Sequence, residues 1–175
     1  MFVRSLKIAT AIVALAATTA AAQKVVATKM GGGGSPHETV EWTVGAAKVT
    51  VTYGRPNLKG RSLDTLAPAG KIWRTGADAA TTLTTDKSLM IGSLMIPAGI
   101  YTLYTIPDAA SWKLVVSKQT GQWGTEYNAD RDLGRTDLKV EKLPEPAEQL
   151  TIGLANNTFT IDWGTTRASA PLMVH

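Results

Sequence analysis

The sequence predicts an all-β domain, either an antiparallel β-sandwich or a partly closed barrel, with one long irregular loop segment. Roughly ten short apolar or alternating segments follow one another at hairpin spacing, separated by turn residues. Only 18% of the residues are charged, while 16 are Gly and 8 are Pro, a composition that argues against a coiled coil or a disordered chain. With no Cys among 175 residues, stability must come from a conventional core, and thiol chemistry is excluded.

The first 22 residues predict a secretory signal peptide. Arg4 and Lys7 precede an apolar run over 8–17, and three alanines end at Ala22. This run is too short for the roughly 20 residues of a membrane-spanning helix. Removing Arg4 and Lys7 from 18 basic residues leaves 16 against 14 acidic ones, too small an excess to indicate nucleic-acid binding. We therefore expect a periplasmic or extracellular protein with no nucleic-acid partner and no membrane span.

Residues 23–34 are expected to form a flexible Gly-rich tether. The segment ends in four successive glycines, Gly31 to Gly34, which lose much conformational entropy when they are ordered. A single β domain is then expected over residues 35–175.

Within this domain the clearest strand is 47–53, which alternates strictly between one apolar face and one polar face. Its two faces carry Val49, Val51 and Tyr53 against Lys48, Thr50 and Thr52. Further strands are expected at 39–43, 80–85, 88–91, 94–97, 100–106, 112–117, 136–143, 149–155, 158–163 and 168–174. Apolar period-two positions predict a core that includes Val49, Val51, Leu103, Leu114, Val116, Ile152 and Ile161.

The segment 58–78 is the expected irregular loop, because Gly60, Pro68, Gly70 and Gly76 interrupt any period. Loops of this length in compact domains are either functional or packed by their own side chains.

The loop and its surroundings concentrate the side chains best suited to ligand binding. Guanidinium groups bind carboxylates and phosphates in a bidentate way, and loop tryptophans stack on sugar rings. We expect a site for a glycan or a small anionic ligand formed by Arg55, Arg61, Trp73, Arg74, Asp78 and Trp123. The structural alternative is an internal network, in which Arg74 pairs with Asp78 and another arginine binds loop carbonyls.

Two further function classes stay open. Asp64 and Asp78 could act as the paired acids of a hydrolase, or the domain could have a structural or interaction role in the cell envelope. His37 is expected to have an ordinary surface or edge role, because it has no evident partner. The oxygen donors Asn128, Asp130 and Asp132 resemble the start of a calcium loop, but a turn capped by its own side chains is the favoured interpretation. No metal and no cofactor is expected.

Five ordered strings give the chain a specific resemblance. They are Tyr53-Gly-Arg-Pro56, Lys59-Gly-Arg61, Trp73-Arg-Thr-Gly-Ala-Asp78 with Thr81, Pro97-Ala-Gly-Ile-Tyr-Thr-Leu103 with Ile106-Pro107, and Trp123-Gly-Thr-Glu-Tyr127. Together they resemble a bacterial exported family catalogued as domain of unknown function 2911, over nearly all of the chain from Ser35 onward. The chain departs from the family at residues 78–79, where we expect Asn and Glu. The resemblance implies a secreted domain and supplies no activity, ligand or catalytic residue.

Overall fold

The computed structural model describes residues 23–175, so the signal peptide predicted for residues 1–22 lies outside the described part of the chain. The described residues form ten strands, one short helix and one 3-10 turn. The strands are β1 (Gln23–Met30), β2 (Pro36–Val44), β3 (Ala47–Gly54), β4 (Thr82–Thr85), β5 (Leu89–Ile91), β6 (Leu94–Ile96), β7 (Gly99–Ile106), β8 (Ser111–Ser117), β9 (Asp132–Ala155) and β10 (Thr158–Val174). The helix is α1 (Leu63–Leu66) and the turn is η1 (Ala129–Arg131). The predicted all-β class is confirmed.

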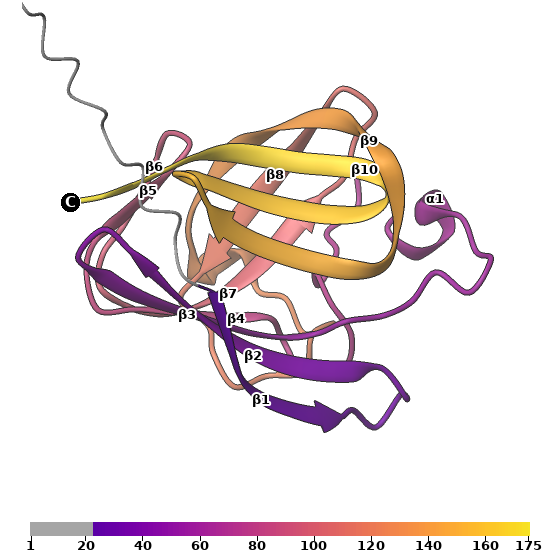
Figure 1. Cartoon of the computed structure of the whole chain (residues 1–175), viewed down its shortest axis with the longest axis horizontal. Helices are drawn as coiled ribbons and strands as arrows, with labels where there is room; N and C mark the ends of the chain where they lie inside the picture. The colour runs from indigo at the N-terminus through magenta and orange to yellow at the C-terminus, as the bar shows by residue number, and fades with distance from the viewer. Residues whose placement is uncertain (1–22) are drawn as a thin grey trace, which may run out of the picture.

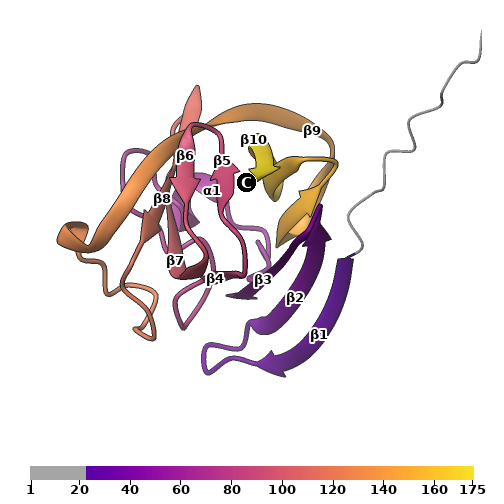
Figure 2. The same ribbon diagram turned by 90° about the vertical axis from the view of Figure 1, so that its left-hand side faces the viewer.

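All ten strands belong to one antiparallel sheet in the order β1-β2-β3-β4-β7-β8-β9-β10-β5-β6. Within residues 23–175 the end strands β1 and β6 do not pair with each other, so the sheet is not closed into a barrel. The sheet instead folds over itself, as in a sandwich: β9 and β10 lie above β2, β3 and β4 (Figure 1). Figure 2 shows β9 arching from β8 across the top of the molecule.

The last two strands are longer than the sequence predicts. The segments expected at 136–143 and 149–155 form the single strand β9, and those expected at 158–163 and 168–174 form β10. Their pairing shifts register on either side of Gly164, whose φ of 58° lies in the left-handed region. Such a bulge bends a strand without ending it, so the interruption seen in the sequence is a bend in a continuous ribbon.

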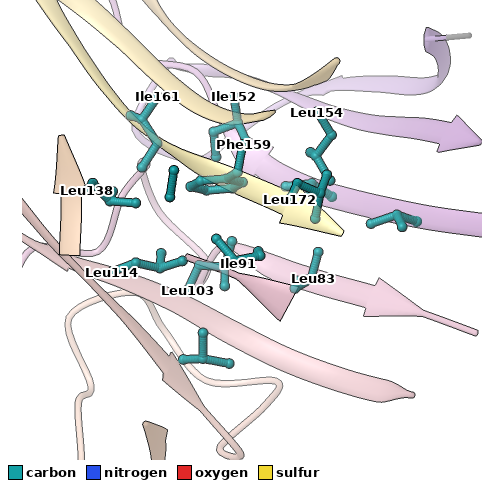
Figure 3. Close-up of a cluster of buried hydrophobic side chains, with 14 of the residues drawn as sticks. Leu83, Ile91, Leu103, Leu114, Leu138, Ile152, Leu154, Phe159, Ile161 and Leu172 are labelled. Carbon is teal, nitrogen blue, oxygen red and sulfur yellow. The ribbon is translucent and has the colours of Figure 1, made fainter. Parts of the chain in front are cut away.

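The core fills the space between the two halves of the folded sheet. Figure 3 shows side chains of β9 and β10, among them Ile152, Phe159 and Ile161, facing Leu103 of β7 and Leu114 of β8. All seven residues predicted for the core are at most 1% exposed, which confirms that prediction.

The long connection from β3 to β4 is irregular, as predicted. It is joined to the sheet at two points and to the loop between β8 and η1 at a third. Isolated bridges link Asn57 to Gln149, Trp73 to Thr105 and Ala79 to Trp123. Trp73 and Thr105 exchange two backbone hydrogen bonds, of 2.7 and 2.9 Å. The connection is therefore fixed against the sheet. Among residues 23–175, no helix is long and apolar enough to cross a membrane.

Residues 23–34 differ from the expected flexible tether. Gln23–Met30 pairs with β2 along its whole length, and Gly31–Gly34 form a turn closed by a hydrogen bond from Gly34 N to Gly31 O (3.0 Å). All eight side chains of β1 are exposed. Because the strand is held by backbone pairing and buries no side chain, its sequence shows no buried face from which it could be predicted.

We expect β1 to be dispensable for stability, since it adds no side chain to the core. A chain that begins at Gly31 should keep its thermal midpoint within about 5 °C of the longer chain. Circular dichroism on heating would measure this, with Leu103→Ala as a control that should lose about 2 to 5 kcal/mol. A loss comparable to that of the control would show that backbone pairing to β1 stabilises the whole sheet.

Candidate functional site

Two adjoining cavities lie beside the connection from β3 to β4. The first, here called the basic cavity, has a volume of about 340 Å³ and is lined by Lys59, Arg61 and Arg74 together with Trp73, Asp78 and the turn residue Gly33. The second, here called the aromatic cavity, has a volume of about 300 Å³ and is lined by Trp73, Tyr104, Tyr127, Ile72 and Thr125. Leu66, Trp73 and Arg74 line both cavities.

The structure brings together four of the six predicted site residues. Arg61, Trp73, Arg74 and Asp78 line the basic cavity. Arg55 and Trp123 line neither cavity. Trp123 is 48% exposed, and it lies in the loop between β8 and η1, where its backbone is bridged to that of Ala79.

Arg55 has a structural role, although through β2 and β9 and not through the loop carbonyls of the internal-network alternative. Its Nη1 donates to Glu38 Oε2 (2.7 Å), its Nε to Leu150 O (3.0 Å) and its Nη2 to Thr151 Oγ1 (2.9 Å). Both side chains of the ion pair are only 17% exposed. Arg55 therefore ties β2 to β9, and the three nitrogens of its guanidinium group are occupied by the protein.

Arg61 and Arg74 are less fully engaged. Arg61 is exposed and donates from Nε to Leu58 O (2.9 Å) and from Nη2 to Asn57 O (3.0 Å). Arg74 is half-buried, and only its Nε is bonded, to Gly76 O (3.2 Å). Within residues 23–175 neither terminal nitrogen of Arg74 has a protein partner, and the expected pair with Asp78 does not form.

The carboxylate of Asp78 is instead held on both oxygens by the N-terminal part of the domain. Oδ2 lies 3.0 Å from Nε2 of His37, and Oδ1 accepts the backbone N–H of Gly33 (3.2 Å). His37 is 5% exposed, which corrects its expected surface or edge role. The pairing was missed because 41 residues separate the two side chains, and no local pattern marks such a contact.

Backbone strain occurs in the wall of the basic cavity, at Lys59 and Asp78, and beside that wall, at Thr75. Lys59, Thr75 and Asp78 have φ values of 51°, 52° and 60°, in the left-handed region that non-glycine residues seldom adopt. Thr75 is β-branched and fully buried, so its strain is the most unusual. Its side chain donates to Thr105 Oγ1 (3.1 Å) and its carbonyl accepts from Thr81 Oγ1 (2.8 Å). Strain of this kind persists only where the surroundings fix it, and it concentrates at ligand sites.

Three glycines allow the chain to pack closely around residues 76–78. A Cβ on Gly76 would lie 2.7 Å from Thr81 Oγ1, and one on Gly124 would lie 2.7 Å from the Asp78 carbonyl oxygen. A Cβ on Gly54 would fall on the backbone of Ala77. Three of the five strings noted in the sequence therefore meet at one strained loop beside the basic cavity.

Comparison with family models assigns the chain to a family. The family model described as "Protein of unknown function (DUF2911)" matches residues 35–172. The chain belongs to this family. No curated protein and no solved structure matches the chain. The DUF2911 description names no activity, so any function must be argued from the geometry of the cavities.

The tryptophan shared by the two cavities is fixed by its neighbours. The ring of Trp73 stacks on Trp163 at 5.3 Å between centroids with 13° between the planes, and it meets Trp112 edge to face at 6.3 Å. With one face covered and one edge packed, Trp73 presents little ring area for sugar stacking.

The aromatic cavity also has two ordered tyrosines. The rings of Tyr104 and Tyr127 pack edge to face at 5.0 Å. Burial raises the pKa of both phenols above the usual value, with the neighbouring Asp132 carboxylate adding to the shift for Tyr127. Both phenols are therefore neutral at pH 7.

The structure does not bring together the residues of the predicted acid pair, and the calcium-like loop is a capped turn. Asp78 lines the basic cavity, whereas Asp64 lines a separate one together with Asp108. The Asn128 side chain accepts the Asp130 N–H (3.0 Å) and caps η1, as the turn interpretation predicts. From residue 23 to residue 175, no group of three His, Asp or Glu side chains is placed to hold a metal ion.

The glycine turn should tolerate a side chain at one position and not at the next. A Cβ on Gly31 would fall on the Asp78 carboxylate and the His37 ring, whereas a Cβ on Gly32 would meet nothing within 4 Å. Gly31→Ala should therefore cost about 1 to 3 kcal/mol, and Gly32→Ala should be neutral or slightly stabilising. Urea denaturation of both variants would test this difference. Equal stabilities would show that the turn does not pack on Asp78 in solution.

Substitution of Arg55 and of Arg61 should lower the free energy of unfolding by different amounts. Arg55→Ala strands the carboxylate of Glu38 in a half-buried position and should cost about 1 to 3 kcal/mol. Arg61→Ala removes an exposed side chain and should cost less than about 1 kcal/mol. Both changes delete the same side chain, so each is the control for the other in chemical denaturation. A large loss of stability in Arg61→Ala would show that Arg61 supports the fold instead of serving the cavity.

Proposed function

We propose that the domain binds a small organic anion in the basic cavity. The observation that carries the proposal is the state of Arg74, whose terminal nitrogens have no protein partner within residues 23–175 although the side chain is half-buried in the cavity wall. A partly desolvated guanidinium group binds carboxylate or phosphate strongly, because the hydrogen bonds are charge-assisted.

The charge balance of the cavity supports an anionic ligand. Lys59, Arg61 and Arg74 contribute three positive charges to its lining. The only acid in that lining, Asp78, already accepts from Gly33 and lies against His37. The basic side chains are thus left without a protein counter-ion in the cavity, and a bound anion would supply one.

The shape and rigidity of the site support the binding of a small molecule. Pockets for small ligands start at roughly 300 Å³, the range into which the basic cavity falls. The strained, hydrogen-bonded loop that carries Arg74 is already ordered, so little entropy is lost on binding. These features favour a metabolite-sized anion over a macromolecular partner.

The glycan and hydrolase alternatives have less support. Trp73 is covered by Trp163, and the exposed Trp123 lies outside both cavities, so neither cavity offers an open tryptophan face to a neutral sugar. A hydrolase would need a second acid beside Asp78, and Asp64 lines a different cavity. The signal peptide predicted from the sequence would place this binding in the periplasm or outside the cell.

Loss of the Arg74 charge should weaken anion binding strongly. In isothermal titration calorimetry with inorganic phosphate and with citrate, Arg74→Gln should weaken binding by about 10- to 100-fold, because it removes charge-assisted hydrogen bonds worth about 1.5 to 3 kcal/mol. The thermal midpoint should change little, because Arg74 makes a single bond to the protein.

The matched control is Arg131→Gln, since the exposed Arg131 lines neither cavity and loses the same charge. That variant should bind both anions like the parent chain. The proposal fails if the parent chain binds neither anion, or if Arg74→Gln and Arg131→Gln bind equally well.

A further inference from the structure

We infer that the anion bound in the basic cavity carries an aromatic or short branched apolar body, which occupies the adjoining aromatic cavity. This inference rests on the proposed function and deepens it, because it names the class of ligand: a small amphipathic anion, such as an aryl phosphate or an arylalkyl carboxylate.

The first reason is that the two cavities adjoin each other at one charged group. Arg74, Trp73 and Leu66 line both of them. A ligand whose acidic group binds the free end of Arg74 therefore has the aromatic cavity within reach on the other side of the same side chain. A purely inorganic anion would leave that second space unused.

The second reason is the chemistry of the second space. Arg74 is the only lining residue that carries a charge at neutral pH, and Ile72 and Leu66 add aliphatic surface. The hydroxyl of Tyr104 donates to Glu126 O (3.0 Å) and accepts from Gln122 (2.9 Å). The hydroxyl of Tyr127 donates to Asp132 (2.7 Å) and accepts from Arg135 (2.9 Å).

These four partners of the phenols do not line the cavity, so the polar ends of both tyrosines are anchored in its surroundings. What the two residues offer to the cavity is ring surface. Ring faces and edges bind other aromatic groups in offset or edge-to-face arrangements. The tyrosine rings and the side chains of Ile72 and Leu66 can therefore receive an apolar group beside the single positive charge of Arg74.

The third reason is size and exposure. A space of roughly 150 Å³ accommodates a benzene ring, and the aromatic cavity offers about 300 Å³. Ile72 at its lip is 37% exposed, and a bound aryl group would cover it. One ring, or a branched chain of similar volume, fits this space.

The test compares ligands that share an anionic group and differ in the apolar body. Calorimetric affinities would be measured for inorganic phosphate against phenyl phosphate and for acetate against phenylacetate, with benzyl alcohol as the uncharged body. The aryl compounds should bind about tenfold or more tightly than their parent anions, the gain expected from burying one ring. Benzyl alcohol should bind weakly or not at all.

A variant that fills the aromatic cavity tests whether the higher affinity of the aryl ligands arises there. Thr125 is exposed and lines the aromatic cavity, so Thr125→Trp should fill this space and abolish the advantage of phenyl phosphate while leaving the affinity for inorganic phosphate within about twofold. Thr84→Trp, at an exposed position of β4 outside both cavities, is the matched control. The Ile72 methyl signals should shift in NMR spectra with phenyl phosphate and not with inorganic phosphate, which tests the location without any variant.

The outcomes separate the two proposals. Phosphate binding that depends on Arg74, with no gain for the aryl compounds, would overturn this inference and leave the proposed function standing. A gain that survives in Thr125→Trp, or that leaves the Ile72 signals unmoved, would also overturn it. Absence of binding for every anion would overturn the proposed function, and this inference with it.

Discussion

The Asp78 carboxylate is the point on which the basic cavity depends. One oxygen lies against His37 on β2 and the other accepts from the glycine turn that precedes β2, while the Asp78 carbonyl accepts from Gly124 in a loop far along the chain. A single residue in a left-handed conformation thus ties three distant segments together. Because His37 and Gly33 engage the carboxylate, it forms no ion pair with the arginine beside it. The cavity keeps its positive charge as a consequence of how the loop is anchored.

The three arginines near the loop have different roles: two of them stabilise the fold, and the third is available to bind a ligand. Arg55 has a carboxylate and two oxygens of β9 within hydrogen-bond reach, and it joins the two halves of the folded sheet. Arg61 braces its own loop from the surface. Arg74 lies between the two and keeps its terminal nitrogens free within the described part of the chain. A guanidinium group whose terminal nitrogens have no protein partner within residues 23–175, on a loop held in a strained conformation, is a costly arrangement for a scaffold and a useful one for recognition.

The sequence predicted this molecule well where the pattern was local. The period-two faces located β3, β7, β8 and the core around Leu103 and Ile161, and the broken period of residues 58–78 located the loop that carries the site. The sequence predicted poorly those residues whose role depends on partners far away along the chain. The sequence predicts a tether in place of β1 because the pairing of this strand with β2 involves only the backbone. It predicts an edge role for His37 because the partner of this side chain is 41 residues away. Arg55 belongs to the predicted site because it is close in sequence to the loop, and Trp123 because of its loop-like, Gly-flanked context. The fold instead directs Arg55 into a structural network and leaves Trp123 outside both cavities.

The eight side chains of β1 all point into solvent, on a strand whose end leads directly into the wall of the basic cavity. Because the chain has no cysteine, a thiol introduced on this strand would be unique. Thr28 lies beside the glycine turn and opposite Glu38. A fluorophore attached there would sit outside the core and within a few residues of Gly33. The molecule thus has a natural attachment point for an optical reporter, from which occupancy of the cavity could be followed without altering any residue that lines it.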